Sequence, residues 1–111
     1  MRVRVLRNED VSKIIAFIPP RHIHTRVALF IGDDVLILQQ ATVDALIRAY
    51  ASVALHPTRR AIELTSVKLF KGARKDGFAE YQLIESGRPE DEVLNEITKL
   101  YYGDETRASD S

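Results

Sequence analysis

The most constraining feature of this sequence is a pair of apolar runs joined by a glycine turn. Arg26–Ile31 and Val35–Gln39 are rich in β-branched and other aliphatic residues, and Gly32-Asp33-Asp34 lies between them. Gly and Asp tolerate the positive φ angles that tight hairpin turns require. The pattern therefore predicts two antiparallel strands joined by a tight turn.

Both runs are apolar at odd and even positions, so each predicted strand carries apolar side chains on both faces. A sheet built from such strands has to be covered on both sides. Helices of the same chain can supply this cover, and so can a second copy of the chain or a partner subunit. The sequence leaves these alternatives open.

The chain has 111 residues, of which 45% are hydrophobic. A chain of this length buries about 60–70% of the surface that its unfolded form exposes, which predicts one domain and excludes an intrinsically disordered protein. The longest apolar stretches, such as Val27–Ile31, are far shorter than the roughly 20 residues of a membrane span. The first ten residues lack the apolar core of a signal peptide. These features predict a soluble, cytoplasmic protein with no membrane partner.

The N-terminal part of the chain predicts one strand and one helix before the central hairpin. Residues 1–6 alternate polar and apolar side chains, the period-2 pattern of a strand with one exposed face. Asn8 is a favourable helix N-cap, and the apolar residues after it follow at helical spacing as far as Ile18. Pro19 then ends the predicted helix over residues 8–18.

A second helix and a second hairpin are predicted after the central strands. Thr42 is a favourable N-cap, and the apolar stripe that follows it predicts a helix ending before Pro57. Arg60–Phe70 and Phe78–Glu85 are rich in strand-forming residues and flank the loop 71–77, which predicts a hairpin with a long tip. The apolar parity changes within the first of these runs, which predicts a bulge near Thr65 and Ser66.

The C-terminal part of the chain predicts a third helix. Pro89 stands at its start, three acidic residues follow, and Gly103 ends the apolar stripe. Residues 104–111 are predicted to form a flexible tail. The expected fold is a single α+β domain of residues 1–103 in the order β-α-β-β-α-β-β-α, with helices packed on a mixed or antiparallel sheet.

Charge is segregated along the chain although the net charge is zero. Residues 1–75 contain 13 Lys or Arg and 6 Asp or Glu, whereas residues 76–111 contain 3 and 10. A net charge of zero can therefore conceal a basic surface that binds phosphates and, beside it, an acidic segment. Eleven of the sixteen basic residues are Arg, and Cys is absent, which resembles a thermophilic composition.

The basic residues form the candidate site. Guanidinium groups are planar, forked donors that match phosphate oxygens, and Phe17, Phe30, Tyr50 and Phe70 are predicted to lie in the core, which leaves few exposed aromatics for base stacking. Recognition of the RNA backbone or shape is therefore favoured over base stacking. The predicted nucleic-acid-binding residues are Arg2, Arg4, Arg21, Arg26, Arg59, Arg60, Lys71, Arg74 and Lys75.

The sequence contains no pattern that predicts catalysis or a cofactor. Absence of cysteine excludes disulfides, thiolate metal sites and cysteine nucleophiles. His22 and His24 are two residues apart, as metal ligands on a strand can be, but no third ligand has suitable spacing, and a basic exposed loop is the favoured interpretation. Asp33 and Asp34 are predicted turn residues rather than paired catalytic carboxylates. We therefore expect no catalytic residue, no metal and no cofactor.

The central hairpin and the helix after it follow a recognisable order. A predicted strand precedes Gly32, the strand Val35–Leu38 follows it, and in the next helix Ala45, Leu46, Ala49 and Ser52 occupy an Ala-Leu-x-x-Ala-x-x-Ser pattern. In this order residues 1–55 resemble the small dimerising subunit of the KEOPS tRNA-modification complex. The resemblance implies a non-catalytic subunit that dimerises a tRNA-modifying assembly and helps to contact tRNA and a kinase-like subunit. The second hairpin and the acidic helix are additions to that family's core.

Two functions follow as expectations. The first is a non-enzymatic module that binds RNA or a ribonucleoprotein, either rRNA or tRNA, in the translation or tRNA-processing machinery. The alternative is a protein–protein adaptor or dimeric assembly subunit without direct nucleic-acid contact, held by its apolar surfaces.

Overall fold

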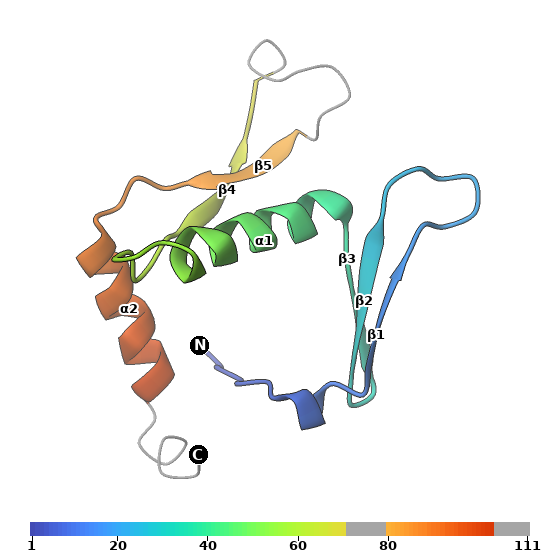
Figure 1. Ribbon diagram of the computed structural model, residues 1–111, viewed down its shortest axis with the longest axis horizontal. Helices are drawn as coiled ribbons and strands as arrows, with labels where there is room; N and C mark the ends of the chain where they lie inside the picture. The colour runs from blue at the N-terminus through green and yellow to red at the C-terminus, as the bar shows by residue number, and fades with distance from the viewer. Residues whose placement is uncertain (71–79, 104–111) are drawn as a thin grey trace. The chain divides into compact units, whose positions relative to one another are not determined.

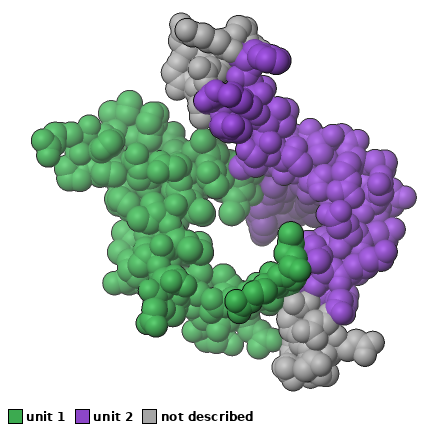
Figure 2. All heavy atoms as spheres, turned by 180° about the vertical axis from the view of Figure 1, so that it is seen from behind, with its two compact units in different colours: residues 1–47 green, residues 48–111 purple. Residues whose placement is uncertain are grey.

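The computed structural model describes residues 1–70 and 80–103, which form an α+β structure (Figure 1). Two antiparallel sheets and two α-helices make up this part of the chain. The chain divides into two compact units, residues 1–47 and residues 48–111, which we call unit 1 and unit 2 (Figure 2). The predicted α+β class is confirmed, although the predicted single sheet is replaced by two.

Unit 1 contains a three-stranded antiparallel sheet. Its strands are β1 (Lys13–Phe17), β2 (Arg26–Ile31) and β3 (Asp34–Leu38), in the spatial order β1-β2-β3. A short 3-10 turn (Asn8–Asp10) precedes β1, and helix α1 (Gln40–Ala54) follows β3. The β2–β3 hairpin confirms the central prediction, with each strand within one residue of its expected bounds.

The glycine turn between β2 and β3 has the geometry that the sequence predicts. Only Gly32 and Asp33 separate the strands, and Ile31 pairs with Asp34. Gly32 has a φ of 57°, whereas Asp33 does not have a positive φ. A positive φ at the first central position alone is the type II′ pattern, whose twist suits the flanking strands.

The prediction for residues 1–18 is wrong. Residues 1–6 form no strand, and the predicted helix over 8–18 is replaced by the 3-10 turn and by β1. The apolar spacing around Ile14 and Ile15 fits a helix, but these β-branched residues also favour strands. Pairing of Ile15 with Ala28 in β2 gives the segment a tertiary partner, which overrides the weak helical preference.

Unit 2 contains a two-stranded antiparallel sheet and an acidic helix. The strands β4 (Leu64–Lys68) and β5 (Tyr81–Glu85) pair in continuous register, from Leu64 opposite Glu85 to Lys68 opposite Tyr81. The predicted bulge near Thr65 and Ser66 is therefore wrong. The parity change arises because Leu64 and Val67 lie on opposite faces of this narrow sheet, which needs no inserted residue.

Both helices end close to where the sequence predicts. Helix α1 ends at Ala54, before Pro57, although it begins at Gln40 rather than after Thr42. Helix α2 (Glu90–Tyr102) has Pro89 as its N-cap, three acidic residues in its first turn and Gly103 as its C-cap. The observed order, β-β-β-α-β-β-α after the 3-10 turn, differs from the predicted one in its first part only. The predicted loop 71–77 of the second hairpin and the predicted tail 104–111 lie outside the described residues.

The hydrophobic core is small. Among the described residues, the buried hydrophobic side chains are Ala28, Ile31, Ala45 and Val93. The predicted burial of aromatic residues is wrong for Tyr50, which is 71% exposed, and for Phe70, which is 84% exposed. Burial depends on which elements pack together, and the first predicted helix, which was expected to cover a sheet, does not form. Neither helix of the described chain is long and apolar enough to cross a membrane.

Candidate interaction surfaces

The predicted nucleic-acid-binding residues of unit 1 lie at the two ends of its sheet. Arg2 and Arg4 precede the 3-10 turn at one end of the unit 1 sheet, whereas Arg21 and Arg26 lie at the other end, where β1 connects to β2. Arg59 and Arg60 belong to unit 2. Lys71, Arg74 and Lys75 lie outside the described residues.

Residues 19–26, which comprise most of the connection from β1 to β2 and the first residue of β2, form a loop held by hydrogen bonds, and we call this loop the hairpin tip. The N–H of His22 donates to the Pro19 carbonyl at 3.0 Å and closes a four-residue turn. Arg21 is the third residue of this turn and has a φ of 68°. Pro20 at the second position and a positive φ at the third define a type II turn, in which Gly or Asn is usual at the third position. The tip therefore holds an arginine in a strained backbone conformation.

Two further hydrogen bonds fix the end of the tip. The N–H of Thr25 donates to Oε1 of Gln40 at 2.7 Å, which ties the tip to the start of α1. Nη1 of Arg26 donates to the carbonyl of His24 at 3.0 Å. The guanidinium of Arg26 is thus partly used inside the loop, whereas the side chain of Arg21 is exposed.

The tip carries positive charge and no carboxylate. The sequence from Val11 to Gly32 contains no Asp or Glu, and the ion pairs seen in the described chain do not involve Arg21 or Arg26. His22 and His24 are exposed beside them. No group of three or more His, Asp or Glu residues in the described chain is arranged to hold a metal ion.

Arg59 and Arg60 lie near Glu90, the first residue of α2. The carboxylate of Glu90 accepts hydrogen bonds from the backbone N–H groups of Arg60 and Ala61. These bonds, with the nearby charge of Arg59, hold the pKa of Glu90 below its ordinary value. Nδ1 of His56 accepts from the N–H of Arg59 at 3.0 Å. The carboxylate of Glu90 therefore partly offsets the charge of Arg59, which makes Arg59 a weaker candidate for phosphate binding than the tip.

The sheet of unit 1 is apolar on both faces. Residues paired across antiparallel strands share a face, so one face carries the row Ile14, Leu29 and Leu36. The opposite face carries the row Ile15, Ala28 and Ile37, together with Phe30, whose ring lies 4.5 Å from the Lys13 ammonium. The strand register therefore places apolar side chains on both faces of the sheet, as the sequence predicts.

Much of this apolar surface is exposed. Among the large aliphatic residues, the most exposed on the first face is Ile14, at 62%, and on the second it is Ile37, at 53%. The exposed large aliphatic residues of the outer strands are Ile14, Ile15, Val35, Leu36 and Ile37. Within unit 1 the extensive contacts between elements are those between paired strands. Both outer strands thus present apolar side chains to solvent.

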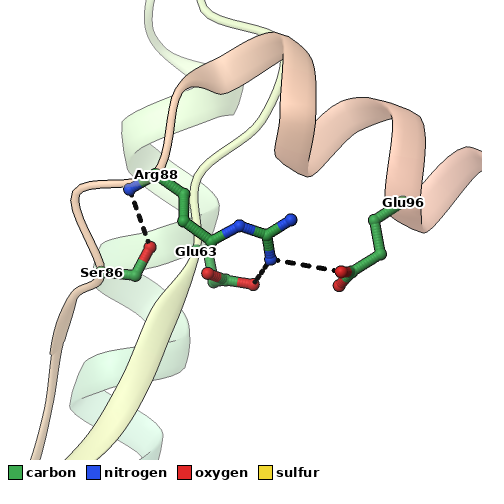
Figure 3. Close-up of polar contacts among 4 residues, drawn as sticks. All are labelled: Glu63, Ser86, Arg88 and Glu96. Carbon is green, nitrogen blue, oxygen red and sulfur yellow. Dashed lines mark hydrogen bonds and ion pairs between the residues drawn. The ribbon is translucent and has the colours of Figure 1, made fainter.

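Arg88 forms ion pairs with two glutamates from different segments of unit 2. Its Nη1 atom lies 2.9 Å from the Glu63 carboxylate and 3.2 Å from that of Glu96 on α2 (Figure 3). Its backbone N–H donates to Oγ of Ser86 at 3.2 Å. Partial burial opposes the charge of Arg88, but the two carboxylates outweigh it and raise the pKa of Arg88. This cluster positions α2 against the segment that leads into β4.

An open groove of about 580 Å³ lies beside this cluster, within unit 2. It is lined by the second half of α1, by residues 60–64 and by α2, and its lining includes Tyr50 and Ile97. The sequence analysis did not identify this groove. The apolar stripes predict the two helices, but Tyr50 is predicted to lie in the core, and only the structure shows that 71% of it is exposed.

Comparisons with known proteins give no relative. No protein-family model, no curated protein and no solved structure matches the chain. The resemblance to the small KEOPS subunit therefore stays a prediction, and the function has to be argued from the surfaces described above.

Proposed function

We propose that this protein is a non-enzymatic subunit of a larger assembly and that another protein chain covers the apolar faces of its unit 1 sheet. The observation that carries the proposal is the exposure of apolar residues on both faces of one three-stranded sheet. A sheet in a monomeric protein commonly exposes one polar face. Here Leu36 on one face and Ile37 on the other are each about half exposed.

The free energy gained by burying these exposed side chains favours binding of a partner. Burying the remaining half of a leucine or isoleucine side chain stabilises a complex by roughly 1 kcal/mol. Each face of the sheet carries at least two of the five exposed aliphatic residues of β1 and β3, so a partner surface on either face can bury more than one of them. Contiguous apolar surface of this kind marks interaction sites in soluble proteins.

The edges of the same sheet favour a protein over a nucleic acid as the partner. Ile31 and Asp34 flank a two-residue turn, so they form the hydrogen-bonded pair next to it. The alternation of the ladder then directs the backbone groups of Val35 and Ile37 away from β2. No strand within residues 1–70 and 80–103 pairs with this edge. A protein chain can bind both the apolar side chains and the open backbone edge.

Site-specific cross-linking in the source cells tests the proposal. A photoreactive amino acid in place of Leu36 should give a discrete protein adduct that resists nuclease. Ile14→Asp, on the same face of the sheet, should abolish that adduct, because a buried charge opposes docking. The control Thr98→Asp, an exposed change in α2, should leave it intact. Absence of a discrete protein adduct at Leu36, or its persistence in the Ile14→Asp variant, would overturn the proposal.

A further inference from the structure

The charges of unit 1 are separated between the two ends of its sheet. Glu9 and Asp10 precede β1, and Asp33 and Asp34 follow β2, so these four carboxylates lie at the end opposite the hairpin tip. A five-residue strand spans about 17 Å, whereas charges are largely screened beyond about 8 Å at physiological ionic strength. The acidic end therefore does little to offset the positive charge of the tip.

The remaining carboxylate of unit 1 does not neutralise the tip either. Asp44 lies about one turn into α1, and no ion pair joins it to Arg21 or Arg26 in the described chain. The tip is thus a surface whose positive charge comes from two arginines, with two exposed histidines beside them. Such a surface attracts a polyanion.

The backbone of Arg21 gives a second, independent indication. The left-handed conformation costs an ordinary residue roughly 1 kcal/mol or more, and glycine adopts it without that cost. Strain of this kind persists at functional sites, where the side chain is needed in that position. The strained residue at this turn is an arginine with an exposed side chain, and it directly follows two prolines.

The tip is also preorganised. The bonds from Thr25 to Gln40 and from Arg26 to the His24 carbonyl fix the loop before any ligand arrives. A ligand therefore binds without having to order this segment, which lowers the entropic cost of association.

We propose that the hairpin tip binds the phosphodiester backbone of single-stranded RNA, with Arg21 as its main phosphate contact. A guanidinium can donate two parallel hydrogen bonds to one phosphate. The exposed imidazoles of His22 and His24 can lie against unstacked bases, which single-stranded RNA offers and a duplex does not. This inference is independent of the assembly function, because the tip residues are not those of the apolar rows.

An anionic membrane is the less favourable polyanion. Each arginine near such a surface contributes roughly 1 kcal/mol, and two arginines therefore give weak binding. Ile23 is 82% exposed at the tip, but stable attachment needs a larger apolar insertion or a second membrane signal.

Fluorescence anisotropy with a short labelled oligouridylate and the full chain tests the proposal. Arg21→Gly removes the guanidinium but suits the turn, so its thermal stability should equal or exceed that of the unchanged protein. Its affinity should fall roughly tenfold, and the slope of log affinity against log salt should become shallower by about 0.7. Arg21→Lys keeps the charge without the fork and should retain the slope while binding less tightly.

Arg7→Gln is the matched control, since it removes one exposed positive charge at the opposite end of the sheet. It should weaken binding less than twofold. Unchanged binding by Arg21→Gly, or an equal loss in Arg7→Gln, would overturn the proposal. Equal competition by duplex DNA or by phosphatidylglycerol vesicles would replace single-stranded RNA with that ligand and so also overturn it.

Discussion

Arg88 donates a hydrogen bond to Glu63 at 2.9 Å, and this pair ties the segment before α2 to the segment before β4. The side chains are partly buried, with 34% of Arg88 and 22% of Glu63 exposed. Glu96 on α2 contacts the same guanidinium from the other side (Figure 3). One cation thus connects three parts of unit 2.

Arg88→Met should destabilise unit 2. The substitution leaves the carboxylates of Glu63 and Glu96 without their shared cation, and partly buried charges that lose a partner are destabilising. We expect thermal unfolding, followed by circular dichroism, to shift several degrees lower. Lys68→Met is the control, because the Lys68–Glu80 pair is exposed and should contribute less than about 0.5 kcal/mol. Equal shifts for the two variants would contradict the role assigned to Arg88.

Glu90 should make unit 2 sensitive to acid. Its pKa is lowered mainly because its carboxylate accepts hydrogen bonds from the N–H of Arg60 and that of Ala61. A folded-state pKa below the unfolded one stabilises the fold above the ordinary glutamate range, and this stabilisation is lost as the pH falls through the folded value.

Thermal unfolding as a function of pH should therefore differ between the unchanged protein and Glu90→Gln. The amide can still accept a hydrogen bond but carries no charge, so the variant should be less stable at neutral pH. The difference should shrink as the solution is acidified. A difference that stays constant across the acidic range would show that the carboxylate charge does not stabilise this contact.

Local sequence signals predict those parts of the fold whose structure is decided locally. Gly32 between two β-rich runs predicts the β2–β3 hairpin, and Pro89 with the acids after it predicts α2. Residues 8–18 are different, because Ile14 and Ile15 suit either a helix or a strand. Their pairing with β2 decides between these states, and a single sequence does not show that pairing.

The candidate surfaces, too, are only partly predictable from local sequence signals. Composition identified Arg21 and Arg26, but the type II turn that strains Arg21 depends on a backbone angle that the sequence does not give. Arg2 belongs to the same predicted group because the pattern of residues 1–6 predicts a strand with one exposed face, and that strand does not form. The exposure of Tyr50 in the groove was missed because an apolar stripe on a helix does not show whether a neighbour covers it.

Arg48 should protect the outer edge of β5. Its guanidinium donates to the carbonyl of Leu83 at 2.8 Å, from α1 to the strand. The N–H of Ser86 bonds to the Glu63 carbonyl, and the ladder alternation from that pair directs the Leu83 carbonyl away from β4. The bond therefore caps a group that β4 does not reach.

Arg48→Met should lower the free energy of unfolding by about 1 kcal/mol, the net value of a hydrogen bond of this kind. Urea denaturation measures the change. The control Asp44→Asn lies one turn earlier on the same helix and should change the free energy of unfolding by less than about 0.5 kcal/mol. If Arg48→Met unfolds at the same urea concentration as the unchanged protein, the bond makes no net contribution.

Gly32→Ala should destabilise the β2–β3 hairpin through backbone strain alone. Gly32 has a φ of 57°, and a Cβ atom at this position would have no atom within 4 Å apart from those of Gly32 and its two chain neighbours. The cost is therefore that of the left-handed conformation, about 1 kcal/mol. Gly32→Asn should cost less, because asparagine tolerates this region better than alanine does. Urea denaturation ranks the three proteins, and NMR contacts between Phe30 and Val35 report whether the register is kept. Equal losses for alanine and asparagine would indicate that the glycine is needed for a reason other than its φ angle.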